Sequence, residues 1–589
     1  MREFFKYLLA TVLGMLIAGF VGMFLLIGTF TAMLTMSEKP VDIKDKSLLV
    51  IRLEDKITER SDNNPLRELE LPGFPGSGQI GLDQILESIA GAKTDDRIKG
   101  IYLNPSNINA GLATVEEIRN ALADFRESGK FVYAYGEELS QIDYYLVSVA
   151  DKLVLNPNGL LQFHGLSARS NFYKNALEKL GVEVQVVRHG KFKAAVEPYM
   201  REEMSPENRL QTSTYLKSIW TRMLTGISSS RGLGTDELNR IADGVATFRD
   251  PARLLEMGLV DTLLYKDEVI GELKKLSSLR EKNDLRLVDV RRYAKVPPQT
   301  DGKGLAPDKI AVIYASGEID MPGSSVTDGI NSEKLSGTIR EARQDSSVKA
   351  IVLRINSPGG SAYGSEVIWR EVKLAAEVKP VIASMGDVAA SGGYYIAAAA
   401  DTILADQTTI TGSIGIFGLI PNAGELLNEK LGITQDVVNT NAHADILSLT
   451  RKMNGFEQDL MQQYIEYGYD TFIGRVAEGR GMSREQVDEI GQGRVWSAED
   501  ALEIGLVDSY GGIREAVALA VERAKLKRYR IVQLPKLKDP FEEILKEITG
   551  EARMRIFGHE LGTEMQALGE FRMLSRGILA RMPCSVRIE

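Results

Sequence analysis

The sequence predicts an α/β fold that occurs twice along the chain. Short runs rich in Val, Ile and Leu alternate with amphipathic segments of about 10 to 15 residues, a pattern typical of parallel sheets built from βαβ units. Residues 97–103 match residues 347–353, and the same offset of 250 residues pairs Gly136 with Gly386. A register held over this length indicates a tandem duplicated domain.

The chain begins with an apolar run, residues 7–36, that contains no charged residue. This run exceeds the roughly 20 residues that a helix needs to cross a bilayer, so we expect residues 1–36 to be a membrane anchor with one transmembrane helix. A cleaved signal peptide is the alternative, but its apolar region usually spans about 7 to 15 residues. Arg2 and Lys6 favour a cytoplasmic N-terminus, whereas three lysines between residues 39 and 46 leave the orientation open.

The two copies are predicted at residues 47–295 and 308–534. The first copy opens with a strand at residues 47–54, and amphipathic helices are expected at residues 114–127 and 364–377.

The segments outside the two copies differ in character. Residues 296–307 carry three prolines and two glycines and are predicted to form the linker. Residues 535–589 form a C-terminal tail without a counterpart in the first copy. Its residues 541–582 have helical periodicity in places, and the sequence assigns this tail no role.

The composition excludes several classes of function. The net charge of −10 is spread along the chain without a basic block, so we expect no nucleic-acid partner. The single cysteine, Cys584, excludes an intramolecular disulfide. The four histidines are scattered without the spacing of metal ligands, so we expect no metal site and no cofactor.

A serine in a turn of small residues is the candidate nucleophile. Ser391 lies between Ala390 and Gly392, where a short apolar run gives way to a helix-like segment. Such a turn presents a hydroxyl to a cleft while the amide of Gly392 points at a reacting oxygen. A tight packed turn without chemistry is the alternative.

A second glycine-rich turn favours the catalytic interpretation. Residues 351–357 form a predicted buried strand that ends in Pro358, Gly359 and Gly360. Amides at Gly359 and Gly360 would complete an oxyanion hole together with that of Gly392.

The two copies differ at these positions. The offset of 250 residues places Gln141 opposite Ser391, so the first copy lacks the nucleophile. The first copy instead has residues 190–198, with two lysines beside small and apolar residues, whereas the equivalent residues 437–445 contain no lysine. Each copy is therefore expected to supply half of a site.

Four motifs carry a resemblance to a known family: residues 356–360, 389–394, 411–418 and 190–198. Together they resemble the signal peptide peptidase A family, also called protease IV, in its long duplicated form. The resemblance implies a Clp-protease/crotonase-like fold in each copy and a Ser/Lys dyad without histidine or metal. Matched by motif, the dyad is Ser391 and Lys193.

The resemblance also implies a location and a substrate class. We expect a serine endopeptidase that crosses the bacterial inner (cytoplasmic) membrane once, has its catalytic domain on the periplasmic side and assembles as a homotetramer. Its expected substrates are extended apolar peptides such as remnants of cleaved signal peptides. A catalytically silent membrane scaffold is the alternative, and an acyl-CoA enzyme of the same fold is a more distant one.

The chemistry sets a condition on the lysine. An ammonium with a pKa near 10.4 is no base at neutral pH, so Lys193 must be buried among apolar groups that disfavour its charged form. Phe192 and the small residues that follow suit this condition. Lys191 and His189 are the rival bases, and Ser413 is the candidate that orients the lysine.

Overall fold

The structure is a computed structural model that describes residues 43–61, 78–296, 306–321, 329–537, 578–582 and 587–588, together with residues 4, 6, 7, 10–15, 17–22 and 28. Most of the predicted anchor and of the predicted linker therefore lies outside the described residues. Within the described ranges, no helix combines the length and the apolar character needed to cross a membrane.

The first copy is built on a parallel sheet of six strands. In spatial order these are β10 (Leu287–Asp289), β1 (Ser47–Ile51), β4 (Ile98–Leu103), β5 (Phe131–Leu139), β6 (Lys152–Leu161) and β9 (Thr262–Leu263). Parallel neighbours require crossovers, and helices supply them.

The second copy repeats this order. Its parallel strands are β20 (Arg530–Leu534), β11 (Lys309–Ser316), β12 (Val348–Ser357), β14 (Val381–Ala390), β15 (Thr402–Ala405) and β19 (Ser509–Tyr510). Two further strands extend it beyond β14, namely β16 (Ile410–Gly412) and β18 (Val495–Ser497). The shared strand order confirms the predicted tandem α/β duplication.

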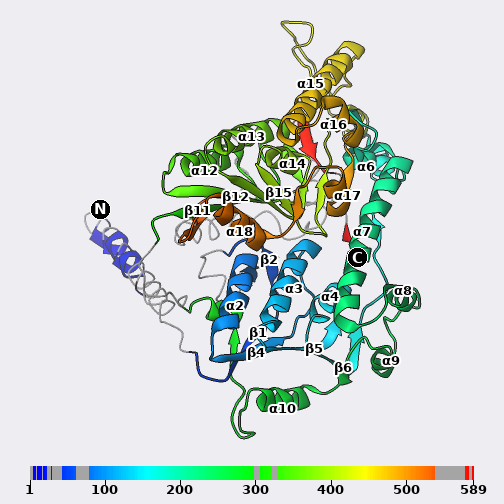
Figure 1. The fold of residues 1–589 in the computed structure, drawn as a ribbon. Helices are drawn as coiled ribbons and strands as arrows, with labels where there is room; N and C mark the ends of the chain where they lie inside the picture. Colours follow the sequence, from blue (N-terminus) through cyan, green and yellow to red (C-terminus); the bar gives the residue numbers. More distant parts are fainter. Residues whose placement is uncertain are drawn as a thin grey trace.

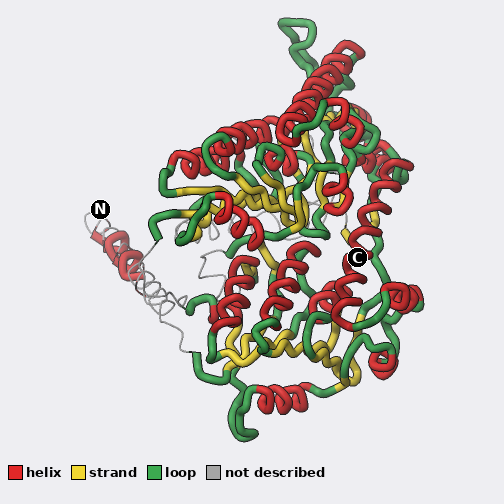
Figure 2. Tube along the Cα trace, viewed as in Figure 1, coloured by secondary structure: helices red, strands yellow, loops and turns green. Residues whose placement is uncertain are grey.

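Helices alternate with the two sheets as layers (Figures 1 and 2). Between the sheets lie α2 (Leu82–Thr94), α3 (Leu112–Arg126), α4 (Gln141–Val147) and α18 (Ile513–Arg523), whereas α12 (Ser332–Gln344), α13 (Ala362–Ala376) and α14 (Gly392–Ala397) cover the outer face of the second sheet. On the far side of the first sheet lies α10 (Lys266–Leu276). The helices predicted at residues 114–127 and 364–377 correspond to α3 and α13.

The remaining helices of the described ranges include two long ones, α7 and α15, and several that are shorter or peripheral. They are α5 (Lys174–Leu180), α6 (Glu197–Met200), α7 (Pro206–Arg231), α8 (Thr235–Asp243), α9 (Pro251–Glu256), α11 (Val290–Tyr293), α15 (Gly455–Arg480), α16 (Arg484–Ile490) and α17 (Ala498–Glu503), with a 3₁₀ turn at Ala194–Val196 and a π turn at Leu426–Lys430. Two short strand pairs join β2 (Lys56–Thr58) to β3 (Gln79–Gly81) and β7 (Ala168–Arg169) to β22 (Arg587–Ile588).

A single apolar core fills the space between the two sheets. It joins Ile85 of α2 and Ile118 of α3 to Val312 and Val352 on the inner face of the second sheet, all of them buried. Because this core contains side chains from both copies, neither copy keeps a complete core without the other.

A small antiparallel sheet connects the copies at one end. Its order is β13 (Gly359–Ser361), β21 (Ile578–Arg581), β17 (Phe417–Asn422) and β8 (Glu183–Arg188), and each neighbouring pair is antiparallel. The first copy contributes β8, the second contributes β13 and β17, and the tail contributes β21. The last residues of the stretch expected to show helical periodicity therefore form a strand, which corrects that interpretation for residues 578–581.

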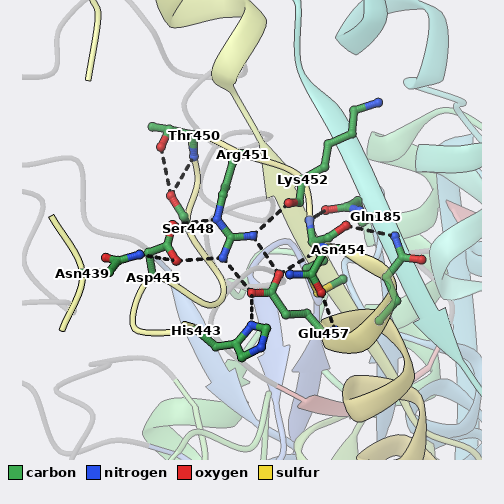
Figure 3. Close-up of polar contacts among 12 residues, drawn as sticks. Gln185, Asn439, His443, Asp445, Ser448, Thr450, Arg451, Lys452, Asn454 and Glu457 are labelled. Atoms are coloured by element: carbon green, nitrogen blue, oxygen red, sulfur yellow. Dashed lines mark hydrogen bonds and ion pairs between the residues drawn. The ribbon is translucent and has the colours of Figure 1, made fainter. Parts of the chain in front are cut away.

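The loop that follows β17 fastens the second copy onto β8 (Figure 3). Arg451 donates to the carboxylates of Asp445 and Glu457, which holds the loop against the start of α15. The amide of Met453 then donates to Gln185 of β8 at 2.9 Å. This loop consequently fixes the strand that leads into residues 190–198.

A buried arginine links the copies at the centre. Arg354 of β12 is fully buried and donates to Glu59 Oε2 at 2.7 Å and to Glu117 Oε1 at 2.5 Å, and both carboxylates belong to the first copy. It also donates to Ser384 Oγ at 3.0 Å. The guanidinium of Arg354 keeps its two anionic hydrogen-bond partners only while the two copies stay together.

Replacing this arginine tests its contribution to the junction. Arg354→Met would leave two buried carboxylates without their cation, so we expect the free energy of unfolding to fall by about 3–5 kcal/mol, measured by denaturant titration. The control is Arg253→Met, which removes the exposed ion pair with Glu256 and should cost less than about 1 kcal/mol. Equal effects of the two variants would contradict this role.

Candidate active site

Ser391 stands at the junction of β14 and α14 in a strained conformation. Its φ of 56° and ψ of −115° lie in a region that residues other than glycine rarely adopt. The amide of Ser391 donates to Gly412 O at 2.8 Å, and the side chain is fully buried. Because the hydroxyl does not cap α14, it remains free to face a different group.

That group is Lys193, which enters from the first copy. Its Nζ lies 2.9 Å from Ser391 Oγ, 3.0 Å from Ser413 O and 3.1 Å from Ser413 Oγ. The side chain is fully buried, and its Nζ lies 5.9 Å from the centre of the Phe417 ring. Burial lowers the pKa of Lys193 well below its usual range. The structure thus brings together the three side chains that the sequence analysis singled out as nucleophile, base and orienting group.

Two glycines make room for the lysine stem. A Cβ on Gly493 would lie 2.6 Å from Lys193 Cβ, and a Cβ on Gly415 would lie 3.3 Å from Lys193 Cδ. Gly493 also has a positive φ of 76°. The sequence analysis missed Gly493, whose only signal is its place in the Gly491–Gly493 turn.

A glutamine from α7 fixes the segment around the lysine. Gln211 donates to Phe192 O at 3.2 Å and accepts from the amide of Val495 at 3.0 Å, so it ties the first copy to β18 of the second. This residue is buried and was likewise not singled out from the sequence.

The glycine-rich turn approaches the nucleophile as expected, with one difference. Gly359 and Gly360 form the start of β13 with φ values of 99° and 152°, and a Cβ on Gly359 would lie 2.6 Å from the amide nitrogen of Gly392. The amide of Gly359, however, donates to Ser357 Oγ at 3.2 Å. Gly360 and Gly392 are therefore the better candidates for oxyanion donors. Gly359 lacks a side chain and so lets its backbone approach the amide of Gly392 closely.

The two rival bases contact other groups. His189 has Nδ1 2.5 Å from Glu466 Oε2, and its ring stacks on Tyr469 with centroids 3.8 Å apart. Lys191 is exposed, with Nζ 5.5 Å from the centre of the Phe192 ring.

The equivalent place in the first copy is closed by a side chain. Gln141 begins α4, and its Oε1 accepts from the amides of His164 and Gly165 at 3.0 Å each. Its Nε2 donates to Gly165 O at 3.0 Å. At the position equivalent to Ser391, the first copy therefore has a side-chain amide that is hydrogen-bonded to the backbone of residues 164 and 165.

The facing edges of β13 and β17 are both paired with β21. Beside these strands lies a cavity of about 650 Å³ that the end of α15 and the loop after β17 enclose. Most of its lining is apolar or aromatic, including Met321, Leu419, Ile420, Met461 and Tyr464. An apolar wall beside these paired strands suits contact with an extended apolar peptide.

Comparisons with known proteins show which family the chain resembles. Residues 124–280 and 373–527 match the family described as Peptidase family S49. The chain is 40% identical over 482 residues to Protease 4 of Salmonella typhi, covering 80% of this chain and 76% of that protein. It is 34% identical over 510 residues to the chloroplastic serine protease SPPA of Arabidopsis thaliana, covering 85% and 74%.

The chain is also similar to a second bacterial protease and to a solved structure. Protease 4 of Haemophilus influenzae is 33% identical over 530 residues, which cover 87% of this chain and 85% of that protein. A solved structure of a ClpP1 mutant from Listeria monocytogenes aligns with 35% of this chain and 94% of its own length, at 18% identity and a TM-score of 0.24.

The buried lysine should weaken the fold in a pH-dependent way. Burial lowers the pKa of Lys193 in the folded chain, so the unfolded chain binds this proton more tightly, and the stability lost to this residue is regained as pH rises toward about 10.4. Lys193→Met should therefore raise the melting temperature at pH 7, and the gain should shrink toward pH 10.

The matched control for this measurement is Lys191→Met, which alters an exposed side chain and should leave the melting temperature nearly unchanged. A melting temperature for Lys193→Met that stays at or below that of the wild type from pH 6 to pH 10 would show that the lysine is not held neutral.

Proposed function

The chain belongs to peptidase family S49, and from this premise we propose that its serine protease activity depends on a dyad of Ser391 and Lys193 divided between the two copies. The observation that carries the proposal is the 2.9 Å contact between Lys193 Nζ and Ser391 Oγ in a fully buried setting.

The contacts of Lys193 suit a general base. A neutral amine has two N–H donors and one lone pair, and the two donors match the carbonyl and the hydroxyl of Ser413. The lone pair then faces the hydroxyl of Ser391. Lys193 removes the hydroxyl proton as Ser391 attacks the peptide carbonyl, and the resulting ammonium donates that proton to the leaving amine.

The oxyanion is held by backbone amides. We assign this role to Gly360 and Gly392, because the amide of Gly359 is hydrogen-bonded to Ser357. The strained turn at Ser391 places Gly392 at the first position of α14, where an amide without a helical partner is available.

The cavity beside β13 and β17 supports an extended, apolar peptide as substrate. Such a peptide would pair with β13 and β17 in place of β21, and the cavity beside these strands offers apolar contacts. Remnants of cleaved signal peptides have this character, which agrees with the family resemblance. A silent scaffold would have no need of a buried neutral lysine, whose burial costs stability.

The remaining assignments rest on the sequence and the family resemblance. We assign a Clp-protease/crotonase-like fold to the copies at residues 47–295 and 308–534. Residues 7–36 would anchor the chain in the bacterial inner membrane with the catalytic part in the periplasm. Four chains would assemble around a shared chamber.

Exchanging either member of the dyad should abolish activity. Ser391→Ala should lower the rate of peptide hydrolysis on the order of 10⁴-fold or more, and Lys193→Ala by about 10²- to 10⁴-fold. In the wild type the rate should rise with pH through the lowered pKa of Lys193, because only the neutral amine accepts a proton. The measurement is hydrolysis of a fluorogenic apolar peptide across pH.

Two controls accompany this experiment. Lys191→Ala and His189→Ala should keep most of the activity, since neither side chain contacts the dyad in the described structure. A fluorophosphonate probe should label the wild type at Ser391, whereas a scaffold would not be labelled. An active Lys193→Ala variant would overturn the dyad.

The anchor is testable by truncation. A chain that starts at Lys46 retains the described first copy and lacks residues 7–36, so it should purify without detergent and keep its peptidase activity. The measurement is size-exclusion chromatography together with the peptide assay. If the shortened chain stayed soluble only in detergent, a second membrane contact would exist.

A further inference from the structure

The loop at residues 491–494, between α16 and β18, holds the two segments that meet at the proposed dyad. The amide of Phe192, the residue before the lysine, donates to Gln492 O at 3.0 Å. The amide of Ser413 donates to Arg494 O at 2.6 Å. One short loop of the second copy is therefore hydrogen-bonded both to the segment of the base and to the residue that orients it.

The side chain of Arg494 lies between two aromatic rings. Its guanidinium carbon is 3.7 Å from the centre of the Trp496 ring and 5.2 Å from the centre of the Phe192 ring. Both aromatic residues are only 9% exposed, and a cation attracts a ring more strongly where water is excluded. Trp496 belongs to the second copy and Phe192 to the first, so the guanidinium joins the copies beside Lys193.

Trp496 fixes one side of this stack relative to both serines. Its Nε1 donates to Ile490 O at 2.9 Å, and its strand β18 pairs with β16. A Cβ on Gly412 would lie 2.7 Å from Trp496 Cδ1, so the ring packs directly on this glycine. Gly412 precedes Ser413, and its carbonyl accepts from the amide of Ser391 at 2.8 Å. The Trp496 ring is thus a fixed support for the serine side of the site.

The loop also packs on the lysine itself. A Cβ on Gly493 would lie 2.6 Å from Lys193 Cβ and 2.8 Å from Lys193 N. Lys193 Nζ has to reach Ser391 Oγ at 2.9 Å from the other copy. A displacement of about 1 Å in such a contact can cost on the order of 10²-fold in rate, so the position of this loop matters for the proposed reaction.

Stacking is the interaction that holds the Arg494 side chain. Its Nε is buried and has no hydrogen-bond partner within the described part of the chain. Burial is the cause that lowers the pKa of Lys193, so an effect of Arg494 on the base would come from the placement and cover of the loop.

We propose that Arg494 is a positioning residue that, stacked between Trp496 and Phe192, aligns Lys193 with Ser391 across the junction of the two copies. The inference rests on the proposed function and adds a residue that acts through Lys193. Without the stack, the segment that carries Lys193 loses a contact that fixes it to β18. The amine then spends less time within reach of the Ser391 hydroxyl, and water reaches it more easily.

The experiment compares Arg494→Met with the wild type on the fluorogenic apolar peptide. The kcat should fall about 10- to 10²-fold. The KM should change less than about twofold, because other residues line the cavity beside β13 and β17. The midpoint of the pH–rate profile should move upward, since a less buried Lys193 binds its proton more tightly. An unchanged kcat and an unchanged midpoint would overturn the proposal.

The matched control is Arg60→Met. The guanidinium carbon of Arg60, in the first copy, lies 5.6 Å from the centre of the Tyr314 ring of the second, so this arginine also contacts an aromatic ring across the junction. Arg60→Met should keep the kcat and the pH midpoint of the wild type. Equal losses of kcat in the two variants would show a general effect of the junction and would contradict a specific role of Arg494.

Two further variants test the stack itself. Arg494→Lys keeps a cation but lacks the flat guanidinium, so its kcat should lie between those of the wild type and Arg494→Met. Phe192→Leu removes one ring, and its combination with Arg494→Met should lower kcat no further than the larger single loss, within about twofold. A double variant whose loss equals the product of the two single losses would contradict a shared contact.

The variant Lys193→Ala separates this inference from the proposed function. If Lys193→Ala stays active, the dyad is wrong and the positioning role is overturned with it. If Lys193→Ala is inactive while Arg494→Met has the kcat and the pH midpoint of the wild type, the dyad stands and only the role of Arg494 is overturned.

Discussion

The complete burial of Lys193 between the two copies is the constraint on which this structure depends. Lys193 becomes neutral only where water and anions are kept away, and its burial requires side chains from both copies. Phe417, Gly415 and Gly493 of the second copy enclose it, while β8 and Gln211 of the first hold its backbone. The proposed active site therefore lies between the copies, because neither copy alone could bury Lys193.

The duplication explains how this arrangement became possible. Two sheets with the same strand order present equivalent turns, but the turn of the first copy is closed by the amide of Gln141. That copy was free to supply the base instead of the nucleophile. Arg354 and its two carboxylate partners then fix the relative position of the copies, which a contact of 2.9 Å between them demands.

Local sequence patterns predicted much of this architecture, but they could not predict contacts between residues that lie far apart in the sequence. The 250-residue repeat and the alternation of strands and helices predicted the tandem α/β fold. The motifs pointed to Ser391, Lys193 and Ser413. The contact between Lys193 and Ser391 joins residues 198 positions apart, so only the tertiary structure reveals it. Gly493 has no side chain, so no functional group marks it in the sequence. Residues 578–581 become a strand because β13 and β17 offer edges, so their own pattern could not reveal it.

The edges of β13 and β17 that β21 covers impose a further condition on the molecule. Unpaired strand edges bind any extended chain that reaches them, and the tail of the same chain reaches them at high effective concentration. Peptides that pair with β13 and β17, as proposed for the substrates, would therefore compete with β21 of the same chain. Binding of Leu579 and Ala580 by β13 and β17 is thus a consequence of the same backbone pairing that would serve catalysis on other chains.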